Sequence, residues 1–367
     1  MVATLSLAMI VKNEEKTIER VLNSARPVCD EMVVADTGST DATQRLAEQC
    51  GAKVVSVPWT DHFAEARNAS FAACQSDWIL WLDADDVLPE ASQKAILHLK
   101  QTVLNQPQWV QVFAPYHYSF NASNVCDFTL QRERLIRNHV GCVWRGVVHE
   151  YVETPTHQAN GEPYQNYAED SLVVEHRQLP ELRQRKVDRN ITLLHKAYQS
   201  GDRTSRTLFY YANELKDHRR HEEALARYEE YLSNPGCQWE QYQAMLQAAY
   251  CCSALNQSHQ TLEWGWRAIR LDPTRAEAWN AVGIVYYKQQ LWQQAIPYFT
   301  AAAACPRPVD GFVHDADYTW MPGDYLSICY DRLGQYRQAI EHSLATLPMS
   351  PEPERLRKNL HWLIDQL

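Results

Sequence analysis

The hydrophobic pattern of this 367-residue chain changes once, near Pro180. Before that point, short apolar runs such as LSLAMIV, EMVVAD and AKVVSV alternate with segments of helical periodicity. Beyond it the strand-like runs stop, and pairs of helices follow. Alternating strands and helices predict a mainly parallel sheet covered by helices, and roughly 150 residues per domain gives two to three domains. We therefore expect an α/β domain over 1–180, a connecting helix over 181–203 and an all-α unit over 204–367.

The α/β region also predicts where its ligand binds. Helices are expected over 14–25, 41–50, 63–73 and 89–104, with short strands between them. The run WILWLDADD is expected to be a buried strand that ends in acidic residues, and open α/β sheets bind ligands beyond the carboxyl ends of their strands. Short extended runs from Trp109 to His176 predict antiparallel strands that complete the same domain.

A weak repeat runs through the helical region. Its members are HEEALARYEEYL, HQTLEWGWRAIRLDP, LWQQAIPYFTAAAACP and YRQAIEHSLATLP, aligned at Ala224, Thr261, Ala295 and Ala339 with offsets of 37, 34 and 44 residues. A helical hairpin repeated near 34 residues, with small residues at the crossing, resembles the tetratricopeptide repeat. We interpret its small and aromatic residues as packing positions rather than as a ligand site.

The charge distribution narrows the classes of partner. The formal net charge is −10, and the acid excess lies in the first 180 residues, with 23 acidic against 14 basic side chains. Binding to nucleic acid or to an anionic membrane needs a positive surface. The composition therefore disfavours both and suits a site that gathers cations. The dense basic run RQRKVDR at 183–189 is interpreted as the solvated face of the connecting helix.

Cysteine usage and apolar runs indicate a compartment. The ten cysteines form no C-x-x-C pair, which indicates reduced thiols rather than a zinc site or a disulfide framework. The first eleven residues are apolar enough for a signal peptide, but no basic residues precede them and Lys12, Glu14 and Glu15 follow, so we interpret them as a buried strand. No run reaches the roughly 18 apolar residues of a membrane span. We expect a cytoplasmic protein.

The acidic strand end carries the strongest chemical signal. Asp83, Asp85 and Asp86 follow the apolar run from Trp78 to Leu82. Three neighbouring carboxylates repel one another unless a cation lies between them, and oxygen ligands at a strand end suit Mg²⁺ or Mn²⁺ shared with substrate phosphates. The alternative is an acidic turn that caps the helix expected from Pro89.

Four motifs occur in one order around this strand: AMIVKNEE, VVADTGSTDAT, FAEARNAS and WLDADD. Further along the chain, RERLIRNHVGCVWRGVVHEYVE and VVEH follow. This combination resembles family 2 glycosyltransferases, in particular the bacterial subgroup with C-terminal tetratricopeptide repeats. The resemblance implies an N-terminal GT-A domain, which is a Rossmann-like nucleotide-diphospho-sugar transferase fold, followed by a helical solenoid.

The resemblance also implies a set of residues that contact the nucleotide sugar. These are Val11, Asn13, Glu14, Asp36, Arg67, Asp83, Ala84 and Asp85. Asp36 would accept a proton from the base or ribose, and its alternative is a helix cap within DTGSTD, where Ser39 or Thr40 could equally cap. Arg67 would approach the diphosphate, and its alternative is a surface ion pair with Glu65 or Asp61.

The metal and the catalytic group are assigned in the same way. Asp85 would bind the metal directly, and His176 would be a further ligand. Asp86 would support the metal ligands without binding the metal, or would cap the following helix. Glu150, in the V-H-E element, is the candidate general base, with a salt bridge to Arg145 or Arg134 as its alternative.

Neighbouring residues complete the expected site. Asp127 and Glu133 are fallback bases, and Trp144 and His149 are candidate acceptor contacts. Trp144 suits either a sugar face or the core, whereas Tyr116 and Tyr118 are assigned to the core.

Two functions from different classes follow from these features. The first is a metal-dependent inverting glycosyltransferase that takes a hexose from a nucleoside diphosphate sugar, expected to be a UDP-sugar. Its helical repeats would present a peptide, a protein or a surface glycan as acceptor. The second is a repeat scaffold with a vestigial transferase domain, which the intact carboxylates Asp83, Asp85 and Glu150 disfavour.

Overall fold

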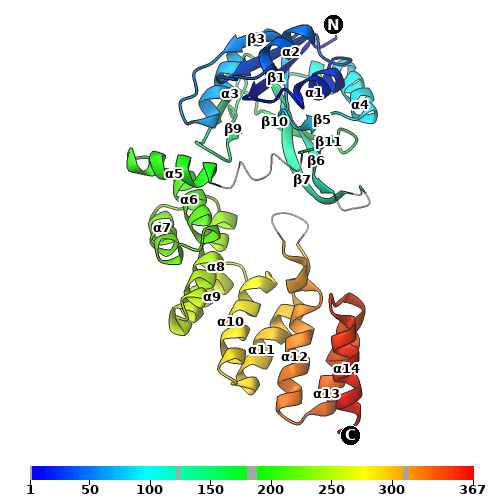
Figure 1. Ribbon diagram of the computed structural model, residues 1–367, viewed down its shortest axis with the longest axis vertical. Helices are drawn as coiled ribbons and strands as arrows, with labels where there is room; N and C mark the ends of the chain where they lie inside the picture. Colours follow the sequence, from blue (N-terminus) through cyan, green and yellow to red (C-terminus); the bar gives the residue numbers. More distant parts are fainter. Residues whose placement is uncertain (1, 121–123, 125, 180–187, 309–312) are drawn as a thin grey trace. The chain divides into compact units, whose positions relative to one another are not determined.

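The computed structural model describes residues 2–120, 124, 126–179, 188–308 and 313–367. The chain divides into two compact units, Met1–Ala197 and Tyr198–Leu367, which Figure 1 colours from blue to green and from green to red. In the described residues the first unit holds the strands and the second is built of helices. The predicted fold class, an α/β domain followed by helical repeats, is confirmed.

Among the described residues, a nine-stranded sheet forms the centre of the first unit. Its strands are β1 (Leu5–Val11), β2 (Glu31–Asp36), β3 (Lys53–Ser56), β4 (Trp78–Trp81), β5 (Asp86–Val87), β6 (Trp109–Phe120), β7 (Cys126–Arg137), β10 (Gln165–Ala168) and β11 (Val174–His176). Their order is β3-β2-β1-β4-β7-β6-β11-β5, with β10 also paired to β6. β1 to β4 run parallel, as predicted, and β7 is antiparallel to both β4 and β6.

The prediction of antiparallel strands throughout residues 109–176 is wrong in part. β10 and β11 run parallel to β6, although β11 is antiparallel to β5. β8 (Val143–Arg145) and β9 (Tyr151–Glu153) leave the main sheet and form their own antiparallel pair. A long connection after β7 lets the chain return in the parallel sense, and the alternation of apolar residues does not encode that return.

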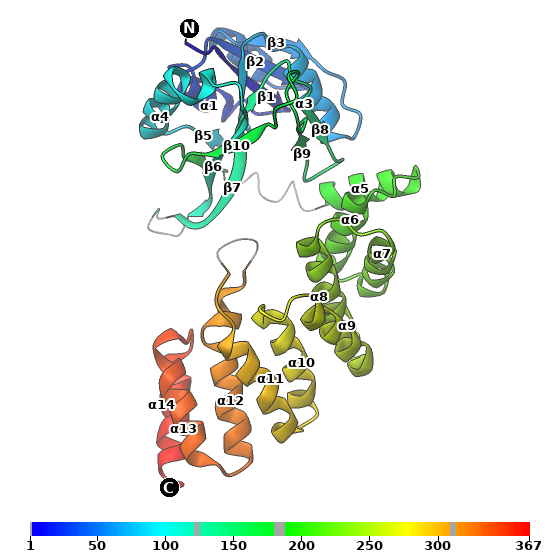
Figure 2. The same cartoon turned by 180° about the vertical axis from the view of Figure 1, so that it is seen from behind.

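Two apolar layers cover the two faces of the sheet because successive strand residues point to opposite sides. Leu7 and Met9 of β1 pack with α1 (Ile18–Ala25), α2 (Thr43–Gln49) and α4 (Glu90–Gln101). Ala8 packs on the other side with α3 (Phe63–Ala72) and the β8–β9 pair. In Figure 2, α1 and α4 lie to the left of the sheet and α3, β8 and β9 to the right.

Helix α1 begins at Ile18 rather than at Glu14, the predicted start. Asn13 adopts a left-handed backbone, with φ of 57°, which asparagine tolerates better than most residues. The Glu14 N–H donates to Thr43 Oγ1 at 2.7 Å. The residues before α1 therefore bind the loop after β2 instead of forming a helical turn.

Helix α4 is also shorter than predicted. It ends at Gln101, and Val103–Asn105 form a separate 3₁₀ turn. Thr102 between them, with φ of −119° and ψ of −86°, is outside the helical region and interrupts the α-helix.

The second unit stacks antiparallel helix pairs. They are α6 (Ser205–Asp217) with α7 (His221–Ser233), α8 (Gln238–Ala254) with α9 (Ser258–Leu271), α10 (Ala276–Lys288) with α11 (Trp292–Ala304) and α12 (Met321–Arg332) with α13 (Tyr336–Thr346), followed by α14 (Pro353–Ile364). The four aligned repeat positions fall on the second helix of each pair, and each is at most 2% exposed.

Close contact between the two helices of a pair explains why small residues occur where they cross, as at Gly283. A Cβ built on Gly283 of α10 would lie 2.8 Å from the Phe299 ring of α11. Gly283 and Phe299 are therefore packing residues, in agreement with the interpretation of the small and aromatic residues of the repeats.

Helix α5 (Arg189–Gln199) lies within the region expected to connect the two domains. Residues 181–187 of that region, and most of the basic run 183–189, lie outside the described residues. Lys196 Nζ contacts Asp61 Oδ2 at 2.6 Å, and the Arg189 guanidinium lies 4.7 Å from the Phe63 ring. These contacts hold α5 on the first unit.

Candidate active site

A pocket of about 670 Å³ opens beyond the carboxyl ends of β1 and β4. Nine of the residues expected at the site line it, namely Val11, Glu14, Arg67, Asp83, Ala84, Asp85, His149, Glu150 and His176. Asn13, Asp36 and Trp144 do not. The pocket gathers residues from widely separated parts of the sequence at the sheet edge where α/β folds bind ligands.

The acidic motif forms a tight turn between β4 and β5. The Asp86 N–H donates to the Asp83 carbonyl at 3.0 Å, and the Asp83 N–H donates to Asp86 Oδ2 at the same distance. β5 then pairs with β11, with Asp86 opposite His176. The turn is what brings His176, 90 residues later in the chain, next to the aspartates.

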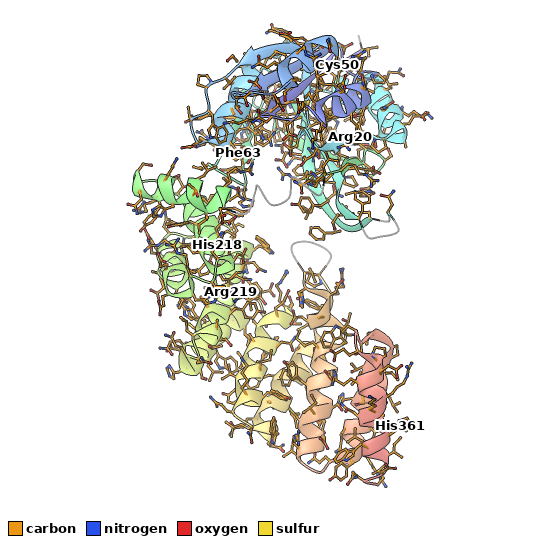
Figure 3. All side chains as sticks on the ribbon, viewed as in Figure 1. Arg20, Cys50, Phe63, His218, Arg219 and His361 are labelled. Atoms are coloured by element: carbon orange, nitrogen blue, oxygen red, sulfur yellow. The ribbon has the colours of Figure 1, made fainter. Side chains whose placement is uncertain are left out.

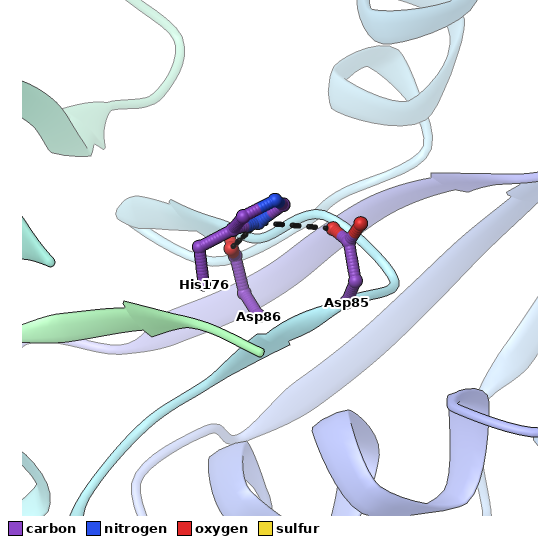
Figure 4. Close-up of side chains that lie close together, drawn as sticks. All are labelled: Asp85, Asp86 and His176. Atoms are coloured by element: carbon purple, nitrogen blue, oxygen red, sulfur yellow. Dashed lines mark ion pairs between the residues drawn. The ribbon is translucent and has the colours of Figure 1, made fainter. Parts of the chain in front are cut away.

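Asp85, Asp86 and His176 form the cluster that Figure 4 shows. One potential ligand atom from each lies within 4.8 Å of the others. His176 Nδ1 is 3.4 Å from Asp85 Oδ1 and 3.5 Å from Asp86 Oδ1. Two carboxylates and an imidazole are a donor set that suits Mn²⁺, and the carboxylates alone suit Mg²⁺. The chemistry of this cluster thus fits a divalent cation.

Contacts around the cluster fix its orientation. Tyr116 Oη donates to Asp86 Oδ1 at 2.8 Å and is 2.9 Å from His176 Nδ1. Arg134 Nη1 donates to Asp86 Oδ2 at 3.1 Å. Asp86 is fully buried, as is Arg134. Asp86 therefore also holds the turn and the strands around it together, in addition to the supporting role expected for it beside the metal. Arg20, labelled in Figure 3, donates to the carbonyl of Arg177 at 2.7 Å and holds the chain after β11.

Burial and charge act on His176 in opposite directions. Burial would lower the pKa of its imidazole, but the carboxylates of Asp85 and Asp86 raise that pKa from 6.5 to about 9. At neutral pH the imidazole is therefore protonated, and its single positive charge offsets part of the charge of the two aspartates. A divalent cation would take the place of this proton.

Arg67 contacts two carboxylates that line the pocket. Its Nε lies 2.6 Å from Glu150 Oε1, and its Nη2 lies 2.8 Å from Asp83 Oδ1. The Arg67 side chain is 6% exposed and stacks on the rings of Trp81 and Trp144. The alternatives weighed from sequence are wrong for both partners, because Arg67 pairs with neither Glu65 nor Asp61.

Glu150 likewise does not pair with Arg145 or Arg134. Arg145 contacts Glu153 at 2.8 Å, and Arg134 contacts Asp86. Burial would raise the pKa of Glu150, but the Arg67 charge outweighs it and holds that pKa below 4.5. Asp83 behaves in the same way, since Arg67 and Arg134 overcome its burial and lower its pKa. Both carboxylates are ionised at neutral pH.

One carboxylate oxygen of Asp36 accepts hydrogen bonds within the turn that follows β2. Its Oδ2 accepts from the N–H groups of Gly38 and Ser39 at 3.1 and 3.0 Å and from Gln44 Nε2 at 2.7 Å. The other oxygen, Oδ1, is buried and has no partner among the described residues. Asp36 therefore holds the turn after β2 and does not cap α2, whose N-cap residue is Ala42 with no side-chain cap, so the capping alternative is wrong.

Asn13 and Trp144 have structural positions. Asn13 Oδ1 accepts from the Thr40 N–H at 2.8 Å and ties the loop after β1 to that after β2. Trp144 is 1% exposed and packs edge-on against Trp81 and Phe71. The predicted acceptor contact at Trp144 is wrong, because its ring belongs to the core.

The tyrosines divide between core and pocket. Tyr116 is 5% exposed, as expected of a core residue, but its hydroxyl reaches the acidic cluster. Tyr118 is 47% exposed and its ring stacks on His176, 5.1 Å away, so the assignment of Tyr118 to the core is wrong. Of the fallback bases, Glu133 is buried and does not line the pocket, and the side chain of Asp127 lies outside the described residues.

Sequence reasoning missed several lining residues. Trp59, Phe63, Arg132 and Arg189 also face the pocket, and Phe63 is labelled in Figure 3. Arg132 belongs to the RERLIR motif, which was noted from the sequence without a function assigned to this arginine. Trp59 and Arg189 are brought to the pocket by loops and by α5, and no local pattern marks them.

The comparisons with known proteins agree with this geometry. Residues 6–144 match the family model described as glycosyl transferase family 2. The N-terminal unit contains a family 2 glycosyltransferase domain. The resemblance on the motifs around Asp85 is confirmed for this domain.

Relatives match parts of this chain. A TPR repeat-containing protein of Synechococcus elongatus is 46% identical over 86 residues, which is 23% of this chain and 21% of that protein. An uncharacterized glycosyltransferase of Rickettsia bellii is 41% identical over 95 residues, or 26% of this chain and 32% of that protein. The prophage-derived glycosyltransferase SunS of Bacillus subtilis is 26% identical over 236 residues, or 63% and 54%. The matches span a fifth to about half of the length of these relatives.

Two solved structures are similar to parts of this chain. The TPR protein YrrB, described as having an unusual peptide-binding site, has a TM-score of 0.38 at 14% identity and covers 49% of this chain and 86% of YrrB. Glucosyl-3-phosphoglycerate synthase from Mycobacterium tuberculosis, in complex with Mn²⁺, UDP-glucose and phosphoglyceric acid, has a TM-score of 0.27 at 33% identity and covers 31% and 44%. Within the described ranges, no helix combines the length and apolar character needed to cross a bilayer.

Proposed function

We propose that this chain is a metal-dependent inverting glycosyltransferase. It moves a hexose from a nucleoside diphosphate sugar, expected to be a UDP-sugar, to a peptide, a protein or a surface glycan. The family match over residues 6–144 and the glycosyltransferase relatives support glycosyl transfer. The observation that carries the finer proposal is the pocket itself, in which Arg67, Asp83, Asp85, Glu150 and His176 converge.

The charge of the pocket suits this donor. Once a metal ion has replaced the proton of His176, the imidazole is neutral, and among the described lining residues the acids Glu14, Asp83, Asp85 and Glu150 are balanced by the cations Lys12, Arg67, Arg132 and Arg189. A divalent cation would therefore leave the pocket with a positive excess. A nucleoside diphosphate sugar carries one negative charge on each of its two phosphates, so cation and donor together restore the balance.

Asp85 and His176, with Asp86 beside them, are the residues that would hold Mn²⁺ or Mg²⁺. Bound there, the ion supplies Lewis-acid stabilisation of the charge that develops on the departing diphosphate. Tyr116 and Arg134 hold the carboxylate of Asp86 in place. The protein thus fixes its ligand groups before the donor arrives, which is the condition for effective electrostatic stabilisation.

Glu150 has the properties of a base for direct displacement. It is ionised at neutral pH, it lines the pocket, and Arg67 fixes its orientation. In the proposed step, the acceptor oxygen attacks the anomeric carbon as its proton passes to Glu150, and the bond to the diphosphate breaks on the opposite face. One displacement of this kind inverts the anomeric configuration.

Arg67 was expected to approach the diphosphate of the donor, but its contacts suggest that it positions two carboxylates instead. Because both Asp83 and Glu150 already contact its guanidinium, we assign it the role of holding these carboxylates apart and oriented. The donor would meet a preformed pair of carboxylates, and the positioning of reactive groups is itself a large part of catalysis.

Metal-dependent donor turnover tests the proposal. The whole chain would be incubated with UDP-, GDP-, CMP- and dTDP-sugars, with and without Mn²⁺, and release of the nucleotide product would be measured. We expect slow hydrolysis of one donor class in Mn²⁺ only, and its loss in Asp85→Asn. Asp170→Asn, which changes an exposed aspartate of the same unit, is the matched control. No binding and no turnover with any donor, from a folded sample, would instead favour the scaffold function.

A further inference from the structure

Three arginine side chains meet at the buried indole of Trp81. The guanidinium carbons of Arg134, Arg67 and Arg132 lie 4.1, 4.6 and 5.1 Å from its ring centroid. A guanidinium stacked on an aromatic face keeps its N–H groups pointing outward in its own plane. What each arginine does therefore depends on the oxygen atoms that lie around its edge.

Two of the three arginines already have short ionic partners. Arg67 contacts two carboxylates at 2.6 and 2.8 Å. Arg134 is fully buried, and its Nη1 donates to Asp86 Oδ2 at 3.1 Å and to the Trp81 carbonyl at 3.3 Å. Arg67 would have to give up a buried ion pair to bind a substrate anion, which is costly, and Arg134 is fully buried and does not line the pocket.

Arg132 is in a different situation. Its side chain is 32% exposed and lines the pocket. In the part of the chain that the structure describes, its ionic contact is with the adjacent Glu133, and this Nε to Oε2 distance is 3.4 Å. Charge-assisted hydrogen bonds are shorter, about 2.7–2.9 Å. The terminal nitrogens of Arg132 are therefore positioned to receive a stronger partner from the pocket.

A β-bulge separates Arg132 from Arg134. Val112 pairs with Leu135 and Phe113 pairs with Glu133, which leaves Arg134 as the extra residue in β7. A bulge bends its strand and re-aims the side chains beside it. The motif RERLIR thus supplies a buried arginine for the acidic cluster and a half-exposed one for the pocket.

We propose that Arg132 binds an oxyanion of a substrate, a phosphate or a carboxylate, through paired N–H groups. The inference rests on the proposed function, since it concerns the ligand of that same pocket. Two sources share this chemistry, namely the diphosphate of the donor and an acidic group on the acceptor. The stacked guanidinium beside Arg67 and Glu150 would align that anion against the reacting groups.

Titration calorimetry on the whole chain tests this assignment. One arm titrates UDP in Mn²⁺, with uridine as the phosphate-free comparison, and the other titrates inorganic phosphate onto protein saturated with UDP and Mn²⁺. We expect Arg132→Gln to weaken binding about tenfold or more in one arm, while uridine binding stays unchanged. Loss in the UDP arm assigns the anion to the donor, and loss in the phosphate arm assigns it to the acceptor.

Two further variants make the result specific. Arg132→Lys keeps the charge but not the paired geometry, so we expect it to recover only part of the affinity. Arg145→Gln removes an exposed arginine outside the pocket, paired with Glu153, and should leave both arms unchanged. Equal losses in Arg145→Gln and Arg132→Gln would overturn the proposal, as would no loss in either arm. If the wild-type chain binds neither UDP nor phosphate, the proposed function fails as well, whereas normal binding by Arg132→Gln removes this inference alone.

Discussion

The two units of this chain bury polar side chains in different ways. In the first, the buried groups around Arg67, Arg134 and Asp86 are charged and contact one another across the sheet and its loops. Both units also bury hydroxyls, and in the second unit these bond within or between helices, such as Thr261 to the Gln257 carbonyl and Ser343 to Ser327. Arg275 and Glu277, 3.8 Å apart at the start of α10, are charged members of the second unit.

This difference separates groups kept for chemistry from groups kept for packing. A buried ion pair seldom stabilises a fold more than apolar residues of the same volume would. A hydroxyl that bonds to its own helix costs little and allows close packing. We therefore infer that the charged cluster of the first unit is kept for the binding pocket rather than for stability. The variants below test this difference between the units, from the largest expected effect to the smallest.

Glu150→Gln should have the largest effect on activity. It keeps the size of the side chain and an oxygen for Arg67 but removes the base, so we expect turnover to fall about 10²–10⁴-fold. Donor affinity should change little, and the free energy of unfolding should fall by less than in a variant that removes Arg67, because Asp83 still pairs with Arg67. Steady-state turnover with the donor found above is the measurement, and Glu153→Gln on the neighbouring strand is the control. Equal turnover in wild type and Glu150→Gln would remove Glu150 as the base.

Arg67→Ala should have the largest effect on stability. It leaves Glu150 and the partly exposed Asp83 without their partner, and breaking a buried pair costs at most about 3–5 kcal/mol. Denaturant unfolding followed by signals from each unit would measure it, with the loss expected in the first unit. A change below about 1 kcal/mol would mean that solvent reaches these carboxylates and that the contrast between the units is smaller than the structure indicates.

Gly283→Ala makes the corresponding change in the second unit. Its new Cβ would meet the Phe299 ring at 2.8 Å, and overpacking of this kind costs about 1–3 kcal/mol. We expect the loss of unfolding free energy to appear in the helical repeats, with donor turnover unaffected. Stabilisation instead, through the better helix propensity of alanine, would show that Phe299 moves away easily.

The pH dependence of turnover should show a smaller effect, which reports how strongly Arg67 acts on Glu150. Because Arg67 lowers the pKa of Glu150 below its ordinary 4.5, the base stays ionised, and the acid limb of the pH profile should lie below 4.5. The stability from these ion pairs has the same sign, being present at neutral pH and lost as pH falls through the lowered values. Arg67→Gln should move the acid limb upward, and an unchanged limb would mean that another group titrates.

The acidic part of the candidate site could be located from the sequence because it follows a strand end. Asp83 and Asp85 come after an apolar run, and the carboxyl ends of parallel strands meet at one edge of a sheet, whereas Val11, Arg67 and Glu150 were assigned through the family resemblance. Repeat spacing located the helix pairs in the same way, through Ala224 and its equivalents. These signals are local, so they survive without knowledge of the tertiary contacts.

Other features depended on contacts between distant segments. Nothing near Arg67 in sequence indicates that its partners are Asp83 and Glu150, and nothing near Trp144 or Tyr118 indicates that the first is in the core and the second in the pocket. The parallel direction of β10 and β11 was likewise missed, because a strand's residues record its burial and not the route by which the chain returned.

The sequence by itself determined the order of an α/β domain and helical repeats, the acidic strand end and the family to which its motifs point. Only the tertiary structure decided which charges compensate one another and which arginine is left facing the pocket. The physical reason is that secondary structure and strand-end chemistry follow from periodicity along the chain, whereas ion pairing depends on distances of a few ångströms between residues far apart in it.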